Sequence, residues 1–178
     1  MSKPLSLLAI HAMVYGLVAW ANTPLPLVPA LVFAGLLIWA SNHDFRTFEI
    51  PDTASVLLAL SGLVHAFALP RSALVDLLLG GIFWPLAFWL VAFAFRQRRG
   101  FDGLGLGDVK LMVGIGLWCG FYGTIWVVLS AALSGIALMM VLALPFRRDG
   151  PRLDQSAVAF GPFLCLSAWG VWATGIGL

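Results

Sequence analysis

Charged residues are scarce in this chain. Only 10% of its 178 residues are Asp, Glu, Lys or Arg, whereas 61% are hydrophobic; a soluble domain has about 25% charged residues. Six or seven membrane spans would fill the 178 residues, so we expect no separate soluble domain. The formal net charge of +2 indicates no particular charged partner, and we expect no nucleic acid to bind. The composition instead predicts a polytopic membrane protein that has the lipid bilayer as a partner.

Cysteine is also rare. Cys119 and Cys165 both lie in apolar runs and form no Cys-x-x-Cys pair, so the sequence supports neither a zinc site nor a disulfide framework. It contains neither Gly-x-Gly-x-x-Gly nor Gly-Lys-Ser/Thr, which argues against nucleotide binding. His11 and His65 lie inside apolar runs, where a hydrogen bond between helices explains each of them more simply than a metal does. We therefore expect no metal and no cofactor.

Long apolar runs dominate what remains. A membrane-spanning helix needs about 20 apolar residues, and long runs favour helices over a barrel of short alternating strands. The sequence therefore predicts an all-α fold with six to seven transmembrane helices, forming one integral-membrane domain over residues 1–178. The first run is expected to be a retained span rather than a signal peptide. The runs are Leu5–Trp20, Leu25–Ala40, Thr53–Leu69, Ala73–Phe95, Asp108–Phe121, Ile125–Phe146 and Ala157–Gly175.

Basic residues fall unevenly between the predicted spans. Nine lie on one side of the membrane and Arg71 lies alone on the other, so the first side is predicted to be cytoplasmic. Asp44 and Asp108 share that side, because two spans separate them. Trp20, Trp39, Trp118 and Trp126 lie near predicted span ends and are expected to be interfacial anchors. The nine basic residues are Lys3, Arg46, Arg96, Arg98, Arg99, Lys110, Arg147, Arg148 and Arg152.

A glycine-rich stretch, Gly103 to Asp108, stands between two apolar runs. Each glycine costs roughly 1 kcal/mol of helix stability relative to alanine, and a carboxylate at the membrane boundary needs a partner or a function. One interpretation is a flexible linker in which Asp108 caps the following helix. The other is a wall without side chains, where a substrate backbone can approach closely.

Two carboxylates on one face suit hydrolysis. When such groups lie close together, one holds a proton while the other is charged, so one activates water and the other donates to the scissile carbonyl. Asp44 and Asp108 are the predicted pair. The simpler alternative for Asp44 is a solvated loop residue paired with Arg46. Asp52 is expected to cap a helix, and Lys110 to reach the interface or to hold a nearby charge.

Three segments resemble the type 4 prepilin peptidases, which are membrane aspartic proteases of the Gly-x-Gly-Asp class. Asp44 to Asp52 is similar to the family's first motif, Asp-x-Arg-x-x-x-Ile-Pro followed usually by Asn. Gly105 to Leu111 is similar to the second motif, and Phe160 to Leu164 to a third segment. Their order and their spread over most of the chain make the resemblance specific. Asp52 departs from the family's usual Asn.

The resemblance implies an endopeptidase of the bacterial inner membrane that removes the short basic leader of prepilins or pseudopilins on the cytoplasmic face. Asp44 and Asp108 are then catalytic. The size is similar to the short peptidases of tight-adherence pilus systems. Longer members carry a region with paired Cys-x-x-Cys motifs and methylate the new N-terminus, so methylation is not expected here. The implied supporting or substrate-binding residues are Gly105, Gly107, Arg46, Lys110 and Pro51.

Two other functions are considered. An intramembrane protease of the presenilin and signal-peptide-peptidase type shares Gly-x-Gly-Asp, but its first aspartate resembles a Tyr-Asp motif within a span, whereas Asp44 follows His43. A small proton-coupled transporter could relay protons through Asp44, Asp108, His11 and His65. Such transporters often contain two repeated halves, and this sequence has no internal repeat.

Overall fold

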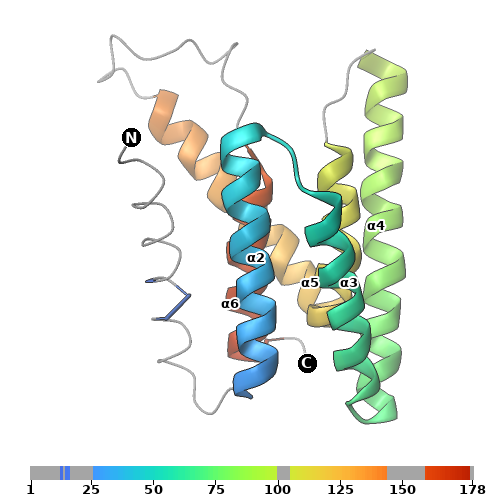
Figure 1. The fold of residues 1–178 in the computed structure, drawn as a ribbon. Helices are drawn as coiled ribbons and strands as arrows, with labels where there is room; N and C mark the ends of the chain where they lie inside the picture. The colour runs from blue at the N-terminus through green and yellow to red at the C-terminus, as the bar shows by residue number, and fades with distance from the viewer. Residues whose placement is uncertain (1–12, 14, 17–25, 100–104, 144–158, 177–178) are drawn as a thin grey trace.

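The computed structural model describes residues 13, 15–16, 26–99, 105–143 and 159–176. Within these ranges the secondary structure is helical and no strand occurs, which confirms the predicted all-α class. His11, Gly103 and most of the predicted span Leu5–Trp20 lie outside the described residues, as does the polar loop Arg147–Arg152. The labelled helices in the described part of the chain are α2 (Leu27–Thr47), α3 (Asp52–Phe67), α4 (Arg71–Arg99), α5 (Leu106–Ala143) and α6 (Gly161–Thr174) (Figure 1).

Helix length and hydropathy agree with a membrane protein. In the described part of the chain, three helices are long and apolar enough to cross a bilayer, over Leu27–Thr47, Arg71–Arg98 and Leu106–Val141, and Asp52–Phe67 is a shorter apolar helix. Many large apolar side chains on these helices face outward, as an apolar solvent requires. The count of six to seven spans stays a prediction.

Helix α2 extends further than the sequence predicted. The predicted span ends at Ala40, but α2 continues through Thr47 and ends at Phe48, which adopts a left-handed φ of 56°. The prediction was wrong because one face of the helix stays buried across the change from apolar to polar residues, at positions spaced by three and four. The buried positions are Leu37, Ala40, Ser41 and Asp44.

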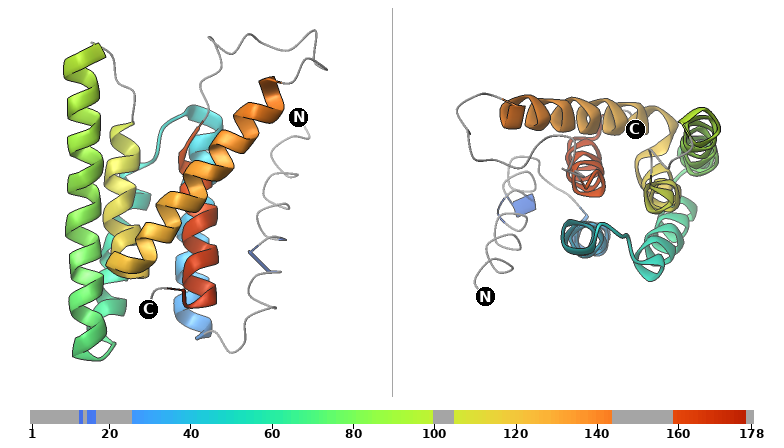
Figure 2. Two further views of the ribbon diagram at one scale, coloured as in Figure 1. Left: turned by 180° about the vertical axis from the view of Figure 1, so that it is seen from behind. Right: turned by 90° about the horizontal axis from the view of Figure 1, so that it is seen from above.

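Helix α5 consists of two arms. Its backbone is interrupted only at Gly120, where φ is 74° and ψ is 179°. The sequence predicts two separate spans here, Asp108–Phe121 and Ile125–Phe146, and the two arms indeed run in different directions from Gly120 (Figure 2). The first arm packs beside α4, and the second crosses behind α6 when viewed as in Figure 1.

Aromatic side chains fill the space between α2, α3, α5 and α6. Trp118 is 1% exposed and stacks on Phe33 and on His65, each with ring centroids 4.5 Å apart. Its indole N–H donates to the carbonyl oxygen of Leu58 at 3.3 Å. The prediction that Trp118 anchors the interface was therefore wrong, whereas Trp39 and Trp126 are 41% and 51% exposed. This core fixes the positions of α2, α3, α5 and α6 relative to one another.

Candidate active site

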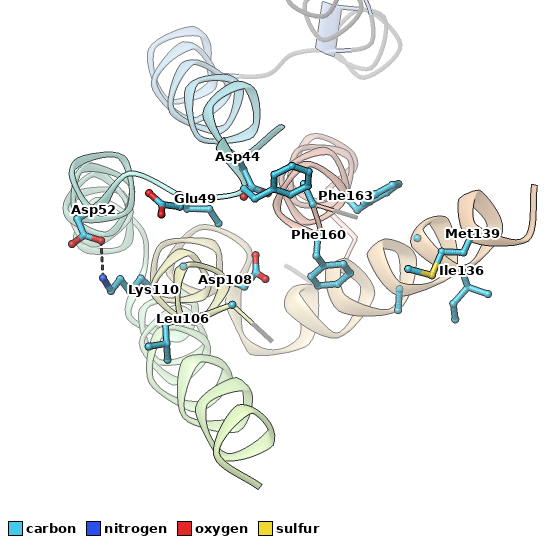
Figure 3. A pocket seen from close by; sticks show the side chains of 17 residues that line it. Asp44, Glu49, Asp52, Leu106, Asp108, Lys110, Ile136, Met139, Phe160 and Phe163 are labelled. Carbon is cyan, nitrogen blue, oxygen red and sulfur yellow. Dashed lines mark hydrogen bonds and ion pairs between the residues drawn. The ribbon is translucent and has the colours of Figure 1, made fainter. Parts of the chain in front are cut away.

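A pocket of about 780 Å³ opens where the ends of four helices meet. Its walls come from the end of α2, the start of α3, both arms of α5 and the start of α6 (Figure 3). Asp44 and Asp108 both line it, although they are far apart in the sequence. The close-up shows both carboxyl groups beside the central space between the helices.

Asp44 is held by the start of α6. Its side chain lies in the last turn of α2 and is 6% exposed. The backbone N–H of Gly161, the first residue of α6, donates to Asp44 Oδ2 at 3.1 Å. A helix N-terminus favours a negative charge. A Cβ atom at Gly161 would lie 2.5 Å from the same oxygen, so only glycine permits this contact without a rearrangement.

Asp108 lies in the first turn of α5 and is 8% exposed. Its backbone N–H donates to the carbonyl oxygen of Gly105 at 3.1 Å. Gly107 packs against Ile50, the residue before Pro51, and a Cβ atom there would lie 3.2 Å from Ile50 Cβ. The glycine therefore lets the start of α5 approach the segment that follows Asp44.

The two carboxylates suit acid–base chemistry. Each is largely shielded from water, where an unpaired charge is costly. Two carboxylates that share one pocket favour a state in which one of them is protonated. In the described ranges, no three His, Cys, Asp or Glu side chains converge as a metal centre requires.

Lys110 and Asp52 form an ion pair at the rim. Lys110 Nζ lies 2.7 Å from Asp52 Oδ1, and the two side chains are 54% and 72% exposed. Asp52 is the first residue of α3 and makes no capping hydrogen bond, because Pro51 occupies the N-cap position. The prediction that Asp52 caps α3 was therefore wrong. The ion pair links the first turns of α3 and α5.

The remaining predicted residues are placed differently. Gly105 lines the pocket beside Gly107, whereas Arg46 is exposed in the last turn of α2 and is not among the pocket-lining residues. The ion pair between Asp44 and Arg46 that was considered as an alternative does not occur among the described contacts. Pro51 ends the segment between α2 and α3.

Several pocket residues were missed from the sequence. Phe48, Phe160 and Phe163 line the pocket, as does one face of the second arm of α5. The family resemblance includes the segment Phe160 to Leu164 but implies no role for it. The sequence signal that could have identified this face of α5 is the helical spacing of its small and apolar residues. The residues on this face are Ala132, Gly135, Ile136 and Met139.

His43 stabilises the turn after Asp44. Its Nδ1 lies 2.8 Å from the carbonyl oxygen of Glu49 and 2.9 Å from Thr47 Oγ1. The backbone N–H of Phe48 donates to the carbonyl oxygen of Asp44 at 2.8 Å. These contacts close the end of α2 and place Phe48 and Glu49 on the pocket wall.

Comparison with known proteins agrees with this arrangement. Residues 31–140 match the type IV leader peptidase family, a range that includes Asp44 and Asp108. A prepilin leader peptidase/N-methyltransferase of Xanthomonas campestris is 30% identical over 146 residues, covering 82% of this chain and 50% of that protein. Proteins of the same name from Dickeya chrysanthemi and Escherichia coli are 32% and 30% identical, over 80% and 82% of this chain and 49% and 63% of theirs.

The chain spans about half the length of these curated relatives. No solved structure matches it. The family match covers both aspartates and most of the helices that form the pocket. The chain therefore belongs to the type IV leader peptidase family.

Proposed function

We propose that the protein is a membrane aspartic endopeptidase that removes the leader peptide from a prepilin or pseudopilin. The observation that carries the proposal is the convergence of Asp44 and Asp108 on one pocket. Family membership and the names of the relatives support the choice of substrate. The proposed localisation is the bacterial inner membrane.

In the proposed mechanism, a water molecule lies between the two carboxyl groups. The charged aspartate takes a proton from water as the oxygen attacks the scissile carbonyl, and the protonated aspartate donates to the carbonyl oxygen. The roles then reverse, and a proton passes to the leaving amine. The two protons belong to the pair, so neither role is assigned to Asp44 or Asp108 alone.

The pocket has a division that suits such a substrate. Charged residues lie on the side of the pocket where α2 ends and where α3 and α5 begin. They include Glu49 and the ion pair of Asp52 and Lys110. Apolar side chains, including Met139 and Phe163, cover the other side. A substrate with a charged leader and an apolar helix can place its leader at the charged side of the pocket and its helix along the apolar side. Gly105 and Gly107 are proposed to let the substrate backbone approach Asp108.

We further propose six to seven spans with the pocket at the cytoplasmic face. Counting both arms of α5 separately, the described helices account for six, and the predicted span Leu5–Trp20 would be the seventh. Arg46 lies in the last turn of α2 and Lys110 in the first turns of α5, at the pocket end, whereas Arg71 begins α4 at the opposite end. Such a distribution favours a cytoplasmic pocket.

The proposal is tested by the position of the cut. The full chain in membranes is incubated with a prepilin, and the products are identified by mass spectrometry. We expect one cut between the leader and the apolar helix. Asp44→Asn and Asp108→Asn should each slow it by about 10²- to 10⁴-fold, whereas Arg71→Gln, at the far end, controls for a change of charge. A cut within the apolar helix would instead indicate a presenilin-like protease, and full activity of either aspartate variant would reject the proposal.

A further inference from the structure

The break in α5 is fixed by a contact with α4. Gly120 has a φ of 74°, a left-handed conformation that glycine adopts without strain. A Cβ atom at Gly120 would collide with the carboxylate of Asp76 on α4. Glycine is therefore required here both for the backbone angle and for the approach of Asp76.

Asp76 caps the second arm of α5. Its Oδ2 accepts a hydrogen bond from the backbone N–H of Phe121 at 3.2 Å. The first N–H groups of a helix have no partner within the helix, and a side-chain carboxylate is a favourable one. Asp76 thus does for this arm what an N-cap residue does, but from a neighbouring helix.

Two further side chains hold the same peptide units. The indole N–H of Trp84, also on α4, donates to the carbonyl oxygen of Phe121 at 3.0 Å. Thr124 Oγ1 donates to the carbonyl oxygen of Gly120 at 2.6 Å. Helix α4 therefore binds both the N–H and the carbonyl of Phe121, which fixes the orientation of that residue relative to α4.

The first arm of α5 also packs closely against α4. Gly80 and Gly116 face each other so closely that a Cβ atom on either would collide with the backbone of the other. Small residues permit this kind of close helix contact in membranes. Helix α4 is thus a common support to which each arm is attached at its own position.

The two arms carry opposite parts of the candidate active site. The first carries Asp108 in its first turn, and the second carries the pocket face that includes Ile136 and Met139. Met139 lies ~28 Å along the second arm from Gly120 at 1.5 Å per residue, so a rotation of about 10° at the break moves it by roughly 5 Å. Small changes at the break therefore change the width of the pocket.

We propose that Asp76 is a positioning residue that sets the opening between the catalytic arm of α5 and its pocket-lining second arm. It acts from the opposite end of the bundle and touches neither reacting atoms nor substrate. The consequence for cleavage rests on the proposed peptidase function, whereas the consequence for arm geometry does not.

The test measures arm geometry and cleavage separately. Phe93→Cys on α4 and Met140→Cys on the second arm are exposed sites outside the pocket, while the native Cys119 and Cys165 are buried. Spin labels at the two sites report the distance between α4 and the second arm. Asp76→Ala removes the acceptor, whereas Asp76→Asn retains an oxygen that accepts the Phe121 N–H and is the matched control.

We expect the distance distribution of Asp76→Asn to match that of the unaltered protein, with kcat/KM for prepilin cleavage within about twofold. Asp76→Ala should shift or broaden the distribution by several ångströms and lower kcat/KM at least about tenfold, as misplacement of a binding wall does. An unchanged distribution in Asp76→Ala overturns the proposal, even if the variant is less stable.

Trp84→Phe provides a milder version if Asp76→Ala does not fold. It removes the other hydrogen bond from α4 to Phe121 and should broaden the distribution less than Asp76→Ala. An unchanged distribution would contradict the claim that contacts from α4 set the orientation of the second arm. If the protein cleaves no prepilin, the proposed function fails while the distance measurement still decides the role of Asp76.

Discussion

At the scale of single residues, the site depends on glycine as much as on aspartate. Gly161 donates its N–H to Asp44, and its missing side chain leaves the space that the carboxylate occupies. Gly107 has a similar relation to Ile50. Sequence motifs revealed both aspartates, but the partner of Asp44 could not be predicted, because it lies on another helix more than one hundred residues away.

We predict that Gly161→Ala impairs cleavage more than it impairs folding. The added methyl group would lie 2.5 Å from Asp44 Oδ2, so the carboxylate must move away from the N-terminus of α6. We expect kcat/KM to fall about tenfold or more, since small displacements of reacting groups are costly. The measurements are prepilin cleavage and the midpoint of thermal unfolding.

Gly170→Ala is the matched control for this change. Gly170 belongs to the same helix, and a methyl group there meets no atom within 4 Å. Cleavage should therefore stay close to that of the unaltered protein. Equal activity of the two alanine variants would show that the contact between Gly161 and Asp44 has no role in catalysis.

At the scale of helices, composition predicted where the apolar segments lie but not how they end. The sequence placed Asp44 in a loop, whereas the structure places it in the last turn of α2, because buried positions continue at helical spacing past Ala40. The break in α5 agrees with the two predicted spans, Asp108–Phe121 and Ile125–Phe146. Its capping by Asp76 was not predicted, because that contact joins two helices.

The contact between α4 and α5 gives a prediction about stability. Gly116→Ala places a methyl group against the backbone of Gly80, so the two helices must separate. We expect the free energy of unfolding to fall by about 1–3 kcal/mol, as overpacking does. Thermal unfolding in detergent measures this change. Gly35→Ala, where the methyl group meets no atom within 4 Å, should not lower the midpoint, and equal midpoints would contradict the close packing.

At the scale of the whole molecule, the end of α2 and the start of α5, which line the pocket, lie at one end of the bundle. The break in α5 lies toward the other end (Figure 2). The basic residues predicted the orientation in the membrane without reference to structure. The sequence could not predict that the second arm of α5 diverges from the first and supplies a wall of the pocket. The outer and inner faces of that arm are both apolar, so the sequence does not distinguish them.

The orientation gives a labelling prediction. Phe48→Cys lies at the pocket end and Arg71→Cys at the opposite end, both exposed, while the native cysteines are buried. In bacteria with a permeabilised outer membrane, a membrane-impermeant maleimide should label Arg71→Cys directly. It should label Phe48→Cys only after the inner membrane is opened. The reverse pattern would place the pocket on the wrong side for a cytoplasmic leader.

The central claim is that Asp44 and Asp108 act as one catalytic pair, and the residual rate of their variants tests it most directly. Residues that act as a unit are strongly non-additive. We therefore predict that Asp44→Asn, Asp108→Asn and the double variant all cleave prepilin at the same low residual rate. A single variant that cleaves at the full rate, or a double variant whose loss is the product of the two single losses, would contradict the claim.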